Sequence, residues 1–159
     1  MEKIIGLLNE LRAGFPQHAR MRADVSAADA GWHLEHSMLV IRRAYRAVLD
    51  SDPAVYRPNY SIRTYLFFNV IKKIPRGRTK APAAVVPGPG ITEETLHQSF
   101  DKTMLAIADF EKAGAKQYFH HRLLGNLDRD RTRLLMELHT RHHLDIIRDI
   151  VGEGENGPC

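Results

Sequence analysis

Apolar residues recur at three- and four-residue spacing along most of the chain, which is the period of amphipathic helices. Five segments carry this pattern, and we expect a helix over each of them: residues 2–13, 27–49, 60–73, 92–112 and 128–151. In the third segment the predicted apolar side consists of Leu66, Phe67, Val70 and Ile71. Polar residues that favour helix N-caps precede the second, fourth and fifth helices, at Ser26, Thr92 and Asp128.

Two segments lack the helical period. Residues 74–91 carry four prolines and three glycines, which predicts a long irregular loop. Residues 113–125 form a shorter connection, and nothing in the sequence supports a sheet. We therefore expect an all-α helical bundle of four long helices with a short extra element, as a single domain over 1–151 and a disordered tail over 152–159.

Composition is that of an ordinary globular protein. The chain has 159 residues and a formal net charge of +4, from 23 basic and 19 acidic side chains that are mostly interspersed. The only cysteine, Cys159, excludes an intrachain disulfide. No apolar run approaches the ~20 residues of a membrane-spanning helix, and no signal peptide is recognisable, so we expect a cytoplasmic protein with no membrane partner.

Histidine is the informative residue type, with nine in the chain. His139 and His143 are four residues apart, so they lie on one face of the last helix. Leu135 precedes them on that face, and Ile146 and Ile150 continue it, which makes it the core-facing stripe. A buried imidazole without a partner costs on the order of 1–3 kcal/mol, and one divalent metal ion shared by both rings would remove that cost.

A second histidine cluster lies early in the second helix. His36 precedes Val40 on one side of that helix and can point inward, and His33 leans towards the same side. One histidine from this helix, with His139 and His143, would form a three-His site inside the bundle. Three neutral ligands with an open position are typical of catalytic zinc, which lowers the pKa of a bound water towards about 7.

Neighbouring polar residues could orient such ligands, and we name His33, Glu35 and His142 as candidates for this supporting role. Thr140 stands where the H-E-x-x-H metalloprotease motif has its glutamate, so the sequence excludes that class of enzyme. Two alternatives remain. In the first, the protein binds metal without catalysis, as a binding or stress-response module. In the second, the histidines are hydrogen-bonded or half-exposed structural residues of a helical interaction module.

Positive charge is concentrated before and within the irregular loop, at Lys72, Lys73, Arg76, Arg78 and Lys80. Arg76, Arg78 and Lys80 are candidates for binding an anionic substrate or cofactor near the metal. The alternative is a solvated basic loop. A nucleic-acid partner is not favoured, because residues 72–91 contain no aromatic residue for base stacking.

The run Trp32–His36 (WHLEH) together with the late run His139–Ile147 (HTRHHLDII) resembles the DinB/YfiT-like family of metal-dependent proteins, and most closely an uncharacterised branch of it. The resemblance implies a four-helix bundle of up-down-down-up topology and a homodimer. It also implies a zinc or nickel ion bound by His36, His139 and His143. Better-understood relatives act with low-molecular-weight thiols, so the expected activity is hydrolysis or thiol transfer. The run His121–Gly125 (HRLLG) departs from the H-P-x-F-G pattern of that branch.

Overall fold

The computed structural model describes residues 1–77 and 81–152, and this part of the chain is mostly helical. Its helices are α1 (Glu2–Ala13), α2 (Ala30–Leu49), α3 (Ile62–Leu66), α4 (Glu93–Phe110) and α5 (Arg129–Val151). A π-helical turn, Phe67–Ile71, continues α3, and short 3-10 turns occur at Phe15–Gln17, Pro53–Val55 and Ala83–Val85. Two strands, β1 (Tyr118–His121) and β2 (Gly125–Asp128), complete the fold.

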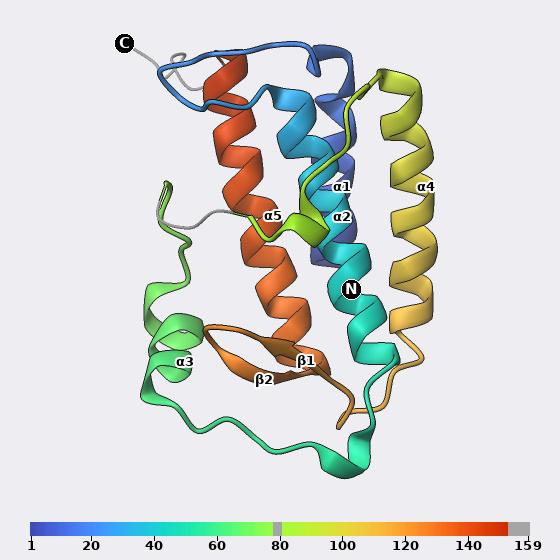
Figure 1. Ribbon diagram of the computed structural model, residues 1–159, viewed down its shortest axis with the longest axis vertical. Helices are drawn as coiled ribbons and strands as arrows, with labels where there is room; N and C mark the ends of the chain where they lie inside the picture. Colours follow the sequence, from blue (N-terminus) through green and yellow to red (C-terminus); the bar gives the residue numbers. More distant parts are fainter. Residues whose placement is uncertain (78–80, 153–159) are drawn as a thin grey trace.

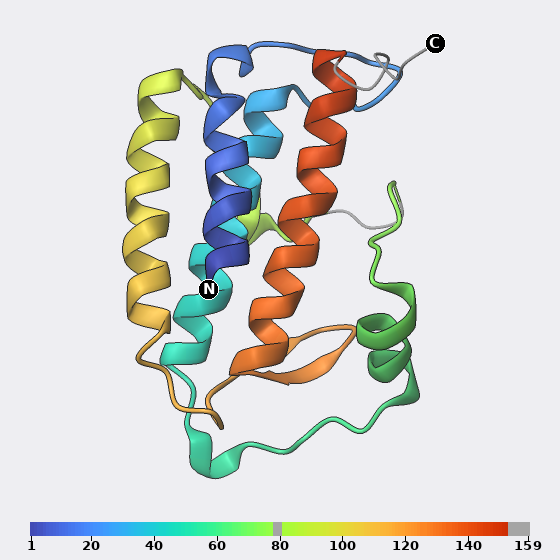
Figure 2. The ribbon, with the colours of Figure 1, turned by 180° about the vertical axis from the view of Figure 1, so that it is seen from behind.

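The four long helices lie side by side, with α1 and α5 running in the direction opposite to α2 and α4 (Figures 1 and 2). Helix α2 contacts both α4 and α5, and α1 also contacts both of them. The core between them is formed by the predicted apolar stripes, which include the fully buried Leu8, Leu34, Ile41 and Leu96. Tyr45 of α2 stacks on Phe110 of α4 with 3.7 Å between ring centroids.

Two of the three predicted caps are confirmed. The Thr92 hydroxyl accepts a hydrogen bond from the Thr95 backbone N–H at 3.2 Å, and Asp128 accepts one from Arg131 N–H at 2.8 Å. The prediction of Ser26 as the cap of α2 is wrong. That helix begins at Ala30, and Asp29 caps it by accepting from Trp32 N–H at 2.7 Å. The carboxylate of Asp29 is three residues before that N–H, as cap geometry requires, whereas Ser26 is six residues before it.

The predicted apolar side of the third helix is confirmed only at Phe67, which is partly buried against the core. Leu66, Val70 and Ile71 are exposed, with 41–66% of their surfaces accessible, and the buried positions are Thr64 and Phe68. At Val70 and Ile71 the reason is the π-helical turn, which rotates each residue by less than the 100° of an α-helix and so moves these side chains to another face. The short helix lies outside the layer of long helices, beside the hairpin (Figures 1 and 2).

The expectation of no sheet is contradicted by the antiparallel hairpin of β1 and β2, in which Tyr118 pairs with Asp128 and His121 with Gly125. Each strand has only four residues, too few to show an alternating pattern. Gly125 adopts a positive φ of 69° directly after the three-residue turn, a conformation that favours glycine. The hairpin contacts α2 and α5, so tertiary packing stabilises a pairing that its sequence barely indicates.

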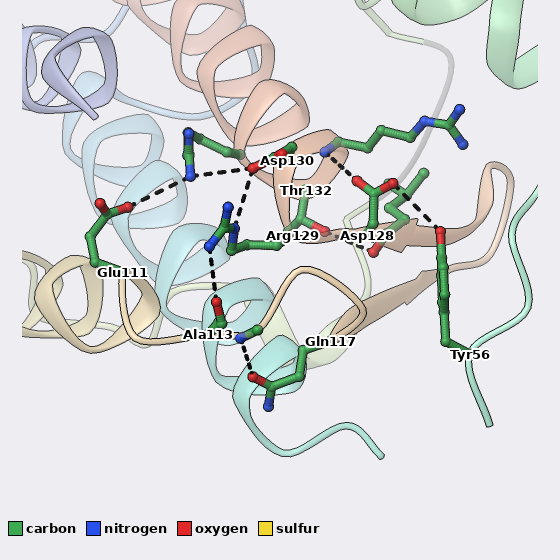
Figure 3. A network of polar contacts seen from close by, with 12 residues as sticks. Tyr56, Glu111, Ala113, Gln117, Asp128, Arg129, Asp130 and Thr132 are labelled. Carbon is green, nitrogen blue, oxygen red and sulfur yellow. Dashed lines mark hydrogen bonds and ion pairs between the residues drawn. The ribbon is translucent and has the colours of Figure 1, made fainter. Parts of the chain in front are cut away.

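Polar contacts attach the start of α5 to the end of α4 and to the hairpin (Figure 3). Asp128 accepts from the Tyr56 hydroxyl at 3.5 Å in addition to capping the helix. Arg129 donates to the carbonyl of Ala113 at 3.0 Å, just after α4. These contacts fix the position of α5 along its axis. They thereby fix where His139 and His143 lie along the long helices.

The predicted irregular loop is confirmed over the described residues 74–77 and 81–91, where the 3-10 turn Ala83–Val85 is the one helical element. This turn packs against α2. The predicted disordered tail lies outside the described residues, apart from Gly152, which ends α5 with a positive φ of 85°. Across residues 1–77 and 81–152, no helix has both the length and the apolar character needed to cross a lipid bilayer.

Candidate metal site

Three histidines from two helices meet between α2 and α5. His36 comes from α2, and His139 and His143 come from successive turns of α5. One nitrogen from each ring can be chosen so that all three lie within 4.8 Å of one another. The ring centroids are 5.2 Å apart for His36 and His139, 4.8 Å for His36 and His143, and 4.5 Å for His139 and His143. The predicted ligand set therefore forms a compact cluster.

The cluster is held in the neutral state that metal ligation needs. Burial, and then the neighbouring histidines, lower the pKa of His139 to about 3. Burial also lowers the pKa of His143, and the four histidines around it lower it further. In His36 burial lowers the pKa although the hydrogen bond to the backbone of Val85 acts in the opposite direction. At neutral pH all three rings thus keep a lone pair available.

His36 is oriented by the loop that follows α3. Its Nδ1 donates to the carbonyl oxygen of Val85 at 2.7 Å. A carbonyl oxygen can only accept, so the proton of the neutral ring is on Nδ1 and Nε2 carries the free lone pair. A carbonyl partner of this kind is what commonly fixes the tautomer of a metal-binding histidine.

His143 is oriented by His33, since their Nδ1 atoms lie 2.9 Å apart. The other nitrogen of His33 lies 2.9 Å from the Ser26 hydroxyl, which also accepts from Ala28 N–H at 3.0 Å. If His143 donates from Nδ1, His33 accepts at Nδ1 and donates from Nε2 to Ser26. His143 then has its lone pair on Nε2. One chain of hydrogen bonds thus runs from the loop before α2 to the cluster.

The third ring, His139, has a buried Nδ1 for which the described residues supply no hydrogen-bond partner. Leaving a buried polar atom unpaired costs about 1–3 kcal/mol. A metal ion bound at Nδ1 would give this atom a partner and would remove that cost. Together with three neutral rings in close approach, this unpaired atom fits a divalent ion with imidazole ligands.

Trp32 covers one side of the cluster. Its indole stacks on the ring of His36 with 4.6 Å between centroids and an interplanar angle of 11°, and its edge meets His33 at 5.1 Å. Stacking restricts the rotation of His36 about its side-chain bonds. The indole also limits the access of water from that direction, which strengthens electrostatic interactions inside the cluster.

Of the other two predicted supporting residues, Glu35 pairs with Arg42, and the ring of His142 lies beside that of His143 with 5.1 Å between centroids. Glu35 accepts from Arg42 at 2.9 Å, and Arg42 also donates to Ser99 and Thr103 of α4. This network joins α2 to α4 and turns Glu35 away from the histidine cluster. His142 makes a backbone hydrogen bond to Ile74, and burial, followed by the nearby charge of Arg76, lowers its pKa.

The predicted anion-binding residues are described only in part. Arg76 donates to the Asp149 carboxylate on α5 at 2.7 Å. Arg78 and Lys80 lie outside the described residues.

Two residues of the site were not anticipated from the sequence. Val85 contributes a backbone carbonyl, which leaves no signature in the side-chain sequence. Ser26 was expected to cap a helix, and it does serve as a hydrogen-bonding residue, but its partner His33 is a side chain seven residues later. An inward-facing histidine with a serine in the preceding loop is the signal that could have suggested this contact.

No protein-family model matches the chain, and no curated protein or solved structure gives a significant match. The case for function therefore rests on the geometry and chemistry of the histidine cluster.

Proposed function

We propose that this protein is a metal-dependent enzyme of the DinB/YfiT-like type, with His36, His139 and His143 as ligands of a divalent ion, zinc or nickel. The observation that carries the proposal is the approach of three neutral imidazole nitrogens to within 4.8 Å of one another. In a tetrahedral zinc site the ligand nitrogens are about 3.3 Å apart. Small side-chain adjustments would bring the rings from their present separation to that distance.

Such an ion supplies Lewis acidity, which lowers the pKa of a coordinated water or thiol. The chain itself supplies the arrangement of the ligands. Val85 and His33 hold the rings of His36 and His143, and Trp32 shields one side. Three protein ligands leave a position open for a small molecule, and this favours hydrolysis or transfer of a low-molecular-weight thiol as the reaction class.

The proposal extends to the fold and assembly. Helices α1 and α5 run opposite to α2 and α4 (Figure 1), an order that supports the up-down-down-up four-helix bundle of the DinB-like type. Assembly as a homodimer is part of the same proposal and is supported by the sequence resemblance alone.

Elemental analysis tests the metal site. Untagged protein, purified without added metal, is compared with the double variant His139→Ala/His143→Ala. A matched control, His97→Ala/His120→Ala, also removes two histidines, both exposed and outside the cluster. We expect near-stoichiometric zinc or nickel in the parent and in the control, and its loss from a variant that circular dichroism shows to be folded.

Two results would contradict the proposal. If the parent contains no metal and takes none up on dialysis against zinc or nickel, the histidines are structural. If metal-loaded protein turns over neither ester, amide nor thiol-transfer substrates while the variant has lost its metal, the site exists but the protein is a metal-binding module and not an enzyme of this type.

A further inference from the structure

A pocket of about 300 Å³ lies beside the histidine cluster, between the segment that follows the π-helical turn and the outer side of α5. Its polar lining consists of Lys72, Lys73, Arg76, Arg141, His142 and Asp145. Arg141 and His142 of α5 lie four and three residues before Asp145, so all three line the same side of that helix. This face is adjacent to the one that carries His139 and His143.

Positive charge dominates the lining, with four cationic side chains and one carboxylate. The carboxylate, Asp145, pairs with Arg148 at 3.3 Å, and Arg76 pairs with Asp149 at 2.7 Å. No hydrogen bond or ion pair within residues 1–77 and 81–152 engages the side chains of Lys72, Lys73 or Arg141. Three exposed cationic side chains thus line this pocket without a partner among the described residues.

The segment that forms one wall is held in place at two points. Lys72 ends the π-helical turn in the left-handed conformation, with φ 46°, and thereby redirects the chain. Further on, His142 bonds the backbone of Ile74, and Arg76 is paired with Asp149. Because both contacts are made to α5, the wall and the helix form one unit, and the cationic side chains are brought together before any ligand binds.

We propose that this pocket binds the carboxylate or phosphate group of a small anionic molecule, with Lys73 and Arg141 as the principal contacts. Lysine and arginine form charge-assisted hydrogen bonds with both groups, which are stronger than bonds between neutral partners. The volume of about 300 Å³ suits a small molecule.

The position of the pocket suggests how it serves the metal site. His142 lines the pocket, and its ring centroid is 5.1 Å from that of its neighbour His143. A molecule anchored by its anionic group would extend from the pocket towards the cluster. The identification of this molecule as the substrate rests on the proposed function, whereas the binding of the anion does not.

Calorimetric titration of metal-free protein at low ionic strength tests the inference, with succinate and inorganic phosphate as probes and succinamide as the neutral analogue of succinate. The pocket variant is Lys73→Gln/Arg141→Gln. The control is Arg43→Gln/Lys102→Gln, which removes the same charge from exposed positions on α2 and α4. We expect the parent and the control to bind both anions but not succinamide, and the pocket variant to bind at least about tenfold more weakly, since it lacks two charge-assisted contacts.

The inference is overturned if the parent binds neither anion, or if the pocket variant and the control lose affinity equally, which would indicate only the general charge of the protein. It is also overturned if His139→Ala/His143→Ala abolishes anion binding, because the anion would then occupy the histidine cluster. Anion binding by a chain that takes up no metal would leave this inference standing and refute the proposed function. Metal uptake without anion binding would refute this inference and leave the proposed function standing.

Discussion

The role of His33 as the support of His143 gives the sharpest prediction. His33 is buried, and its two ring nitrogens bond His143 and Ser26, each at 2.9 Å. Replacing it in the variant His33→Phe keeps a flat ring against Trp32 but removes both nitrogens. The metal ligands are all retained, so any change in metal affinity must come from the lost hydrogen bond and the packing around it.

The magnitude follows from one hydrogen bond. In the variant, Nδ1 of His143 becomes a buried imidazole nitrogen without a partner, at a cost of about 1–3 kcal/mol. The bond is stronger when His143 donates as a metal ligand, so most of this cost falls on the metal-bound state. Loss of such supporting bonds typically weakens metal binding about 10- to 100-fold, which corresponds to about 1.4–2.7 kcal/mol. The two arguments agree on a zinc affinity reduced by one to two orders of magnitude.

Competition with a chromogenic chelator measures the zinc affinity, and urea unfolding of the metal-free proteins measures the change in stability. Ser26→Ala is the matched control, because it removes a contact one step further from the cluster and leaves the His33–His143 bond in place. We expect a clearly smaller loss of affinity for the control. An unchanged zinc affinity in a folded His33→Phe protein would refute the reasoning, as would an equal loss in both variants.

Two further predictions concern stability. Because the pKa values of His33 and His139 are lowered to about 4 and about 3, the unfolded chain takes up protons below its ordinary histidine pKa of about 6.5 that the folded chain excludes. The free energy of unfolding of the metal-free protein, measured in urea, should therefore fall as pH decreases from 6.5 to 4.5, by about 1.4 kcal/mol per pH unit for each such histidine. A flat profile would show that these rings are protonated when folded. Arg42→Met breaks the network from Glu35 to α4 and should cost about 2–3 kcal/mol in urea unfolding. The same change at exposed Arg43 should cost less than about 0.5 kcal/mol, and equal effects would contradict the structural role of the network.

Local pattern was enough to predict the long helices and two of the three histidines of the cluster. The rotation of 100° per residue places His139 and His143 on the stripe that also carries Leu135 and Ile150, whatever the rest of the chain does. Helix starts at Thr92 and Asp128 were equally predictable, because a cap bonds a backbone N–H only three residues away.

The same local reasoning failed where the backbone departs from the regular period. The π-helical turn after α3 moved Val70 and Ile71 to the surface, and the four-residue strands of the hairpin were too short to be recognised. Ser26 was assigned to the wrong partner, because Asp29 is at the distance from the first turn that a cap requires.

Only the tertiary structure decided how His36 joins the pair on α5. Its periodicity allowed an inward position, but the approach depends on the packing of α2 against α5 and on the height at which the contacts in Figure 3 hold α5. The orientation of the His36 ring depends on the carbonyl of Val85, 49 residues away. The orientation of the His143 ring depends on its bond to His33, 110 residues away. Helical periodicity is a property of a few consecutive residues and can be read from them. A binding site is an arrangement of distant segments, and its geometry is set by the packing that brings those segments together.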